Sequence, residues 1–275
     1  MRKIVLGAVS VIALTAAANA ADFKKPVYKA LPPPPVPVSN WTGFYFGANA
    51  GYSWGRADST VFSGTLDARD VRANVNGWLA GVQAGYNWQI GSSFLFGFEA
   101  DAQLTGERGG LSAAAAPIGV VLGGNTLVTT VTANNSYSMP WFATFRGRLG
   151  VLAGPDTLLY GTGGLAVGEV KYSTQNFVTS QLLAPGGAPA GAAVTVAGAD
   201  LSERQTRLGW ALGAGIEHKF TPSLSAKVEY LYLDFGHRTY FGNVVGTQTD
   251  VRFRDHIARV GLNYAFDYGV IAARY

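Results

Sequence analysis

The chain of 275 residues contains no cysteine. This absence excludes disulfide bridges, thiolate catalysis, zinc sites built on cysteine and a lipid anchor on an N-terminal cysteine. Histidine is almost as scarce, with only three residues scattered along the chain. Because metal sites need several such ligands close together, the sequence predicts neither a metal nor a cofactor.

Charged residues are also scarce, at 14% of the chain against roughly 25% in ordinary soluble domains. A soluble β-protein covers its outside with polar side chains, and this composition supplies too few of them. Glycine, in contrast, is abundant, at 36 of 275 residues where about 7% is usual. The composition therefore favours a protein whose outside meets lipid.

Long apolar runs are missing beyond the first twenty residues. Residues 1–20, "MRKIVLGAVSVIALTAAANA", combine a basic start, a short apolar run and the small-residue sequence Ala18-Asn19-Ala20, which is typical of a cleaved secretory signal peptide. After residue 20, no stretch approaches the ~20 apolar residues of a membrane-spanning helix. Without Arg2 and Lys3 the charge falls to 19 − 17 = +2, and no basic run indicates nucleic-acid binding.

Residues 21–40, "ADFKKPVYKALPPPPVPVSN", form a proline-rich segment. Consecutive prolines favour an extended polyproline II conformation and exclude a central strand. We interpret this segment as a periplasmic tether. Whether its lysines and prolines also contact peptidoglycan stays open, since most such linkers are only spacers.

The stretch "NWTGFYFGANAGYSWG", residues 40–55, alternates large apolar residues with small or polar ones. A period of two predicts a β-strand with one apolar face. Seven further segments show a similar strand pattern: 77–90, 93–104, 141–153, 158–170, 208–220, 224–235 and 256–266. In the glycine-rich segment 158–170 the two faces cannot be assigned.

Short and long connections alternate between these segments. Tight turns are expected at Gly91-Ser92, Gly154-Pro155-Asp156 and Thr221-Pro222, and long loops at 56–76, 105–135, 173–205 and 237–250. This alternation is typical of outer-membrane barrels, with short periplasmic turns and long extracellular loops. We therefore predict an all-β fold, an eight-stranded antiparallel transmembrane up-and-down β-barrel over residues 41–266, followed by a C-terminal extension, 267–275. The Gly/Ala/Pro-rich loops 105–135 and 173–205 are expected to be mobile, or to extend the rim of the barrel as irregular hairpins.

Charged residues occur on the small-residue face of the strands, all at similar depth. In lipid, charges at that depth are costly, whereas in a narrow lumen opposite charges can pair. We therefore predict a lumen charge layer formed by Glu99, Asp101, Arg146, Arg148, Glu217, Lys227, Glu229 and Arg259. The lipid-facing residues are then Phe44, Phe46, Tyr52, Trp54, Trp78, Trp88, Phe94, Phe96, Trp141, Trp210, Tyr264 and Phe266. The alternative, a soluble lipocalin-like barrel with the rings inside, would need more charge outside.

Four stretches carry a family resemblance: "NWTGFYFGANAGYSWG", "GWLAGVQAGYNWQI", "GWALGAGIEHKFTPSLSAKVEYLYLDFG" and "DHIARVGLNYAF". They resemble the alphaproteobacterial outer-membrane immunogenic proteins, small porin-family barrels related to the OmpA-like transmembrane domain. The resemblance covers about residues 41–266 and implies export, insertion by the barrel-assembly machinery and contact with outer-membrane lipid and lipopolysaccharide. Such barrels end on the aromatic residue of the last strand, so either Phe266 or Tyr275 is the expected assembly signal.

Three functions remain open from the sequence. The first is a structural and surface-exposed role in envelope integrity and as a surface antigen, with a largely plugged lumen. The second is a small-solute, porin-like channel. The third is an enzyme at the outer rim built on His237 or His256 with Asp234 or Asp255. No serine or third group stands at a convincing spacing, so we predict that the chain is not an enzyme.

Overall fold

The computed structural model describes residues 40–63, 66–114, 116–241 and 249–266. The expected signal peptide, the tether up to residue 39 and the extension 267–275 with Tyr275 lie outside the described residues. Among the residues that are described, no helix is long and apolar enough to cross a membrane.

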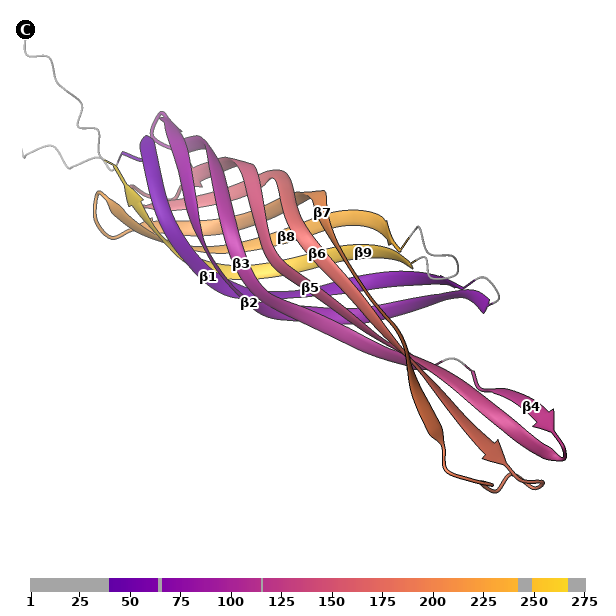
Figure 1. The fold of residues 1–275 in the computed structure, drawn as a ribbon. Helices are drawn as coiled ribbons and strands as arrows, with labels where there is room; N and C mark the ends of the chain where they lie inside the picture. Colours follow the sequence, from indigo (N-terminus) through magenta and orange to yellow (C-terminus); the bar gives the residue numbers. More distant parts are fainter. Residues whose placement is uncertain (1–39, 64–65, 115, 242–248, 267–275) are drawn as a thin grey trace, which may run out of the picture. The chain divides into compact units, whose positions relative to one another are not determined.

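The described part of the chain forms nine antiparallel strands (Figure 1). They are β1 (Gly43–Ser63), β2 (Leu66–Ile90), β3 (Phe94–Ala114), β4 (Ile118–Leu122), β5 (Asn125–Leu152), β6 (Thr157–Leu183), β7 (Val194–Lys219), β8 (Leu224–Tyr240) and β9 (Thr249–Ala265). β1 pairs with both β2 and β9, and β3 pairs with both β2 and β5. The pairings therefore run in a closed series from which only β4 is excluded, since it pairs with β5 alone.

The short connections lie together at one end of this series. They span residues 91–93, 153–156 and 220–223, where the alternating pattern predicts tight turns. Gly91 and Gly154 have φ values of 64° and 88°, a conformation that glycine adopts without steric cost. At the same end, the backbone N–H of Phe266 donates to the carbonyl oxygen of Phe44 at 2.9 Å, so Phe266 completes the pairing of the last strand with the first.

The segments 105–135 and 173–205 extend the strands as hairpins, but these hairpins are regularly paired and not irregular as expected. β3, β5, β6 and β7 continue into these segments, and β5 alone is 28 residues long. The physical reason is composition: Thr and Val recur there, for example in 126–132, and β-branched residues favour a pleated sheet. Gly123 and Gly124, both with positive φ, form the two-residue turn that joins the additional strand β4 to β5.

Beyond the ring, the strands separate into two sheets. β2 and β3 are paired up to Val75–Gly109, and β7 and β8 up to Trp210–Asp234. The distal sheet is formed by β4 and by residues 107–114, 125–139, 169–183 and 194–207 (Figure 1). The facing sheet is formed by residues 55–63, 66–75, 235–240 and 249–255. The predicted loops 56–76 and 237–250 therefore also contain paired strand, while 242–248 lie outside the described residues.

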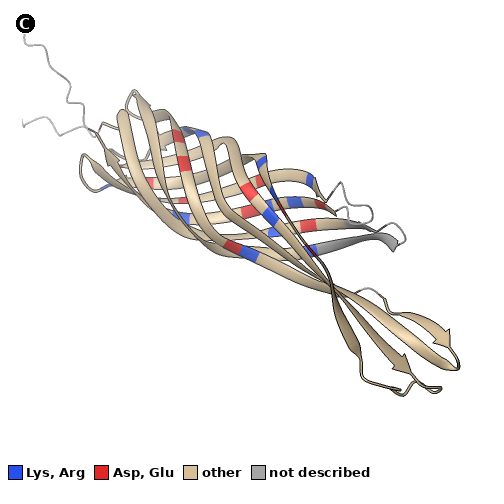
Figure 2. Ribbon diagram, in the orientation of Figure 1, with Lys and Arg blue, Asp and Glu red and all other residues tan. Residues whose placement is uncertain are grey.

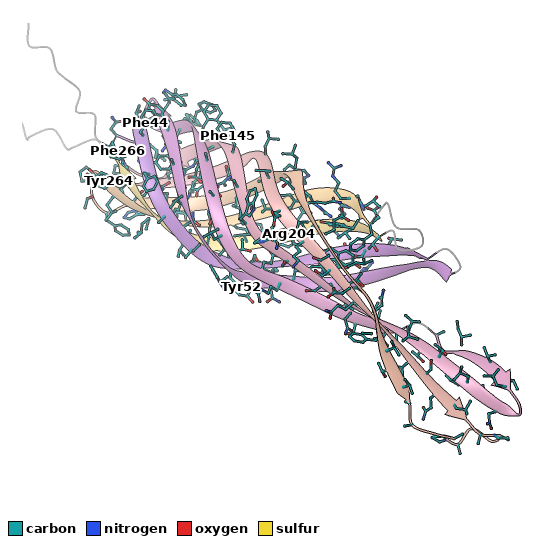
Figure 3. The ribbon with its side chains drawn as sticks, in the orientation of Figure 1. Phe44, Tyr52, Phe145, Arg204, Tyr264 and Phe266 are labelled. Atoms are coloured by element: carbon teal, nitrogen blue, oxygen red, sulfur yellow. The ribbon has the colours of Figure 1, made fainter. Side chains whose placement is uncertain are left out.

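Side chains alternate between the inside and the outside of the ring. Ten of the predicted lipid-facing residues are exposed on its outside, among them Phe44 and Trp78 at 52% and 58%. Phe96 and Trp141 are half-buried. The Phe96 ring packs between the rings of Trp88 and Phe98. Figure 3 shows the labelled Phe44, Phe145 and Tyr264 on the outer side of the ribbon.

The faces of segment 158–170, which the sequence left unassigned, alternate as in the other strands. Leu158 and Tyr160 on β6 are buried inside the ring, and Leu159 and Leu165 are exposed on its outside. Glycines occupy positions on both faces here, so side-chain size carries no signal for the orientation.

Candidate functional site

The predicted charge layer lies inside the ring, at the level where the strands of the closed series are paired. Its acids and bases come from β3, β5, β7, β8 and β9, and each is at most 5% exposed. Figure 2 shows acidic and basic positions along the middle of the strands. The structure brings all eight side chains into one connected network of four bases and four acids.

Arg146 lies at the centre of this network. Its Nη2 is 2.6 Å from Glu99 Oε1 and 2.8 Å from Asp101 Oδ2. Its Nη1 is 3.1 Å from Glu229 Oε1, and its Nε donates to Thr144 Oγ1 at 2.9 Å. Since every guanidinium nitrogen has an acceptor, the buried charge of Arg146 is well compensated, as burial of a charge requires.

Three further bases complete the layer. Arg259 Nη2 is 2.6 Å from Glu229 Oε2, and Lys227 Nζ is 2.8 Å from Glu99 Oε2. Arg148 Nη2 is 2.7 Å from Glu217 Oε2, and its guanidinium lies 4.0 Å from the centre of the Tyr160 ring. The layer has no net charge, and its side chains fill the interior of the ring at this level.

Uncharged side chains that hydrogen-bond to the charge layer could not be predicted from the sequence. Tyr45 donates its hydroxyl to Glu99 at 2.8 Å, and Tyr160 donates to Glu229 at 3.1 Å. Glu217 Oε1 accepts from Ser225 at 2.6 Å and from Asn263 at 2.7 Å. The period-two pattern places these residues on the inner faces, except Tyr160, but nothing in the sequence indicates which carboxylate each one meets.

A second group fills the interior on the side of the short turns, and we call it the turn-side layer. It consists of Trp41, Leu95, Leu158 and Tyr160, all at most 4% exposed. Trp41 Nε1 donates to the carbonyl oxygen of Pro155 at 3.0 Å, and Lys219 Nζ is 4.6 Å from a Trp41 ring centre. The residues immediately before β1 thus fold into the ring.

A third group, the outer core, fills the ring beyond the charge layer and continues between the distal and the facing sheets. The centre of the Tyr172 ring on β6 is 5.5 Å from that of Tyr240 and 5.4 Å from that of Phe241. The Tyr137 ring stacks on the Tyr172 ring, with their centres 4.9 Å apart. Burial raises the pKa of Tyr172 and Tyr240 above the ordinary value, so both stay neutral. The remaining members are Ala57, Ala73, Val75, Leu79, Met139, Phe142, Ala166, Val170, Ala211, Leu231, Leu233, Phe235, Val251, Phe253 and Ile257.

The histidine–aspartate pairs considered for a rim enzyme are not assembled. Asp255 is buried inside, whereas the His256 ring stacks on Trp54 outside at 6.1 Å, and Tyr230 Oη lies 2.6 Å from its Nδ1. Asp234 pairs with Arg252 at 2.7 Å. His237 Nδ1 instead lies 3.4 Å from Asp250 at an exposed position.

Comparison with known proteins identifies relatives along nearly the whole chain. Residues 6–266 match the family model described as the outer membrane protein beta-barrel domain. The 31 kDa outer-membrane immunogenic protein of Brucella melitensis is 33% identical over 282 residues, covering 97% of this chain and 100% of that protein. The 25 kDa outer-membrane immunogenic protein of Brucella abortus is 25% identical over 271 residues, covering 97% and 99%.

Solved structures resemble the chain more distantly. The outer membrane protein OprG from Pseudomonas aeruginosa is 12% identical, with a TM-score of 0.40 and coverage of 83% of this chain and 99% of that one. The attachment invasion locus protein of Yersinia pestis is 13% identical, with a TM-score of 0.34 and coverage of 80% and 99%. These scores are too low to support any inference about function.

Proposed function

The chain belongs to the outer membrane protein β-barrel family and resides in the outer membrane, and from this premise we propose a structural, surface-exposed barrel with a largely plugged lumen. The observation that supports the plug is the charge layer, whose eight buried side chains meet inside the ring. The turn-side layer and the outer core fill the interior on either side of it. The predicted family and location are confirmed by the comparisons.

The proposal assigns eight membrane-crossing strands to the closed series β1, β2, β3 and β5–β9. An eight-stranded barrel has an interior just wide enough for side chains to fill. β4 then belongs to the distal sheet outside the membrane. The exposed apolar side chains on the outside of the ring, such as Phe44, Leu212 and Val260, suit contact with acyl chains.

We assign a role in envelope integrity and as a surface antigen to the same arrangement. A filled ring carries no solute, and its two outer sheets present a large face to the surroundings. We also propose that the proline-rich tether contacts peptidoglycan. Phe266 is proposed as the assembly signal in preference to Tyr275, because Phe266 pairs with Phe44 at the end of the last strand.

Conductance tests the plugged lumen. Because paired charges and apolar side chains fill the interior, we expect purified, refolded protein to give no steady single-channel current in a planar bilayer. A large and stable conductance would overturn the plug and support the small-solute channel instead. The variant Arg146→Ala, measured beside the unmodified protein, serves as the leak control because it removes the central side chain of the charge layer.

Protease access tests the orientation. The distal sheet is expected outside the cell and the short turns in the periplasm, since short turns of such barrels face the periplasm. Protease added to whole cells should therefore cut within 105–135 or 173–205, as read by mass spectrometry of the membrane fraction. Cuts that appear only after the outer membrane has been permeabilised would contradict this orientation.

Processing gives a separate expectation. Protein extracted from the outer membrane should begin near Ala21, because Ala18-Asn19-Ala20 has the small residues that signal peptidase requires. Intact-mass measurement distinguishes this product from the full chain. A mass that includes Met1 would disprove cleavage.

A further inference from the structure

A hollow of about 480 Å³ lies on the outside of the ring, over the four neighbouring strands β2, β1, β9 and β8. Aromatic side chains line it on one side: Trp54, Tyr232 and His256. Arg56 and Arg254 line it as well. It is separate from the filled lumen, because these side chains point away from the ring interior.

The positive charge in this hollow is only partly compensated. Arg56 stands directly opposite Arg254 in the pairing of β1 with β9, and like charges in that position repel. Arg254 forms an ion pair with Asp58, which also lies 3.5 Å from Arg72. One carboxylate thus pairs with two arginines, while Arg56 forms no ion pair with any residue whose side chain the structure describes.

The hollow lies directly beyond the aromatic residues on the outside of the ring. Along β1, the outward positions run Tyr52, Trp54 and then Arg56, so a charge directly follows two aromatic rings. Aromatic girdles mark the boundary between the acyl chains and the headgroups in such barrels. Arg56 and Arg254 therefore stand at headgroup depth, on the side away from the short turns.

We propose that Arg56 and Arg254 bind a phosphate group of a glycolipid headgroup in the outer leaflet. A dianionic phosphate removes the repulsion between the two arginines, and guanidinium groups match its oxygens with paired hydrogen bonds. Asn76, which also lines the hollow, offers an amide to sugar hydroxyls. The acyl chains continue along the apolar outside of the ring. This site rests on the outer-membrane location and not on the plugged lumen.

The test measures binding of fluorescently labelled lipopolysaccharide to the full mature chain in detergent micelles. Without both guanidinium groups, the double variant R56Q/R254Q is expected to bind about tenfold more weakly, since charge-assisted bonds supply the affinity. The matched control is R204Q: Arg204 is exposed on the distal sheet, 3.9 Å from Glu169, and is labelled in Figure 3. The control should bind like the unmodified protein.

Further binding measurements distinguish a lipid phosphate from soluble phosphate. Lipopolysaccharide freed of its lipid A phosphates should bind about as weakly to the unmodified protein as the intact form binds to R56Q/R254Q. D58N should bind the intact form more tightly, because the competing carboxylate is gone. Equal binding by R56Q/R254Q and the unmodified protein would overturn the proposal. Full competition by inorganic phosphate at equal concentration would show a site for soluble phosphate and refute the lipid headgroup.

Discussion

Replacing Arg146 with alanine is expected to lower the free energy of unfolding by about 3–5 kcal/mol, the typical cost of removing one partner of a buried ion pair. Three carboxylates lose a contact at once, because Arg146 reaches Glu99, Asp101 and Glu229. The remaining bases cannot replace it, since the layer then holds four acids and three bases. The loss should be far larger than for a surface arginine, where ion pairs contribute about 0–1 kcal/mol.

Urea unfolding in detergent micelles, followed by circular dichroism, measures this loss. Arg204→Ala is the control for removing an exposed arginine. Arg146→Ala combined with Asp101→Asn restores the balance of charge and should recover part of the stability. If Arg146→Ala unfolds at the same urea concentration as the unmodified protein, the charge layer does not stabilise the ring.

Replacing Tyr172 with alanine should lower the free energy of unfolding by about 3–5 kcal/mol, as large-to-small changes of buried aromatic residues do. Its ring contacts those of Tyr137, Tyr240 and Phe241, and thereby joins the distal sheet to the facing sheet. The cavity left behind would separate the two sheets. Segment 169–183 should therefore become more accessible to protease in whole cells.

Two control variants separate packing from other effects. Tyr172→Phe keeps the ring and loses the hydrogen bonds of its hydroxyl, among them the one donated to Asn135 Oδ1 at 2.8 Å, so most of the stability should remain. Phe177→Ala removes a ring from the same strand at a half-buried position and should cost less. A loss for Tyr172→Ala no greater than that for Phe177→Ala would contradict the bridging role of Tyr172.

The interior of the ring could be predicted largely from spacing. Glu99 and Arg146 lie on the face of small and polar residues, and each directly follows a phenylalanine of the opposite face, so a charge on the inner face is easily recognised. Their partners could not be predicted, because the choice depends on strand register. Tyr160 illustrates this point: it lies in the glycine-rich segment whose faces carry no size pattern, yet its ring stacks against the guanidinium of Arg148.

The outer sheets show where pattern reasoning fails. Glycine, alanine and proline between 105 and 135 indicate an irregular loop or hairpin, whereas the Thr and Val residues of 126–132 favour regular strand. Gly123-Gly124 forms a tight hairpin turn within this composition. Pairing across the hairpin satisfies the backbone of this segment, so β3 and β5 continue far beyond the ring.

The far part of the distal sheet is uncharged: residues 109–139 and 172–199 contain no Lys, Arg, Asp or Glu, and Figure 2 shows this end without coloured positions. In the proposed orientation, each hairpin at this end has to pass from the periplasm through the apolar layer of the bilayer during insertion. Every charge carried through that layer adds several kcal/mol to the barrier. These two long hairpins therefore translocate with a low desolvation barrier, and their length need not slow the biogenesis of the protein.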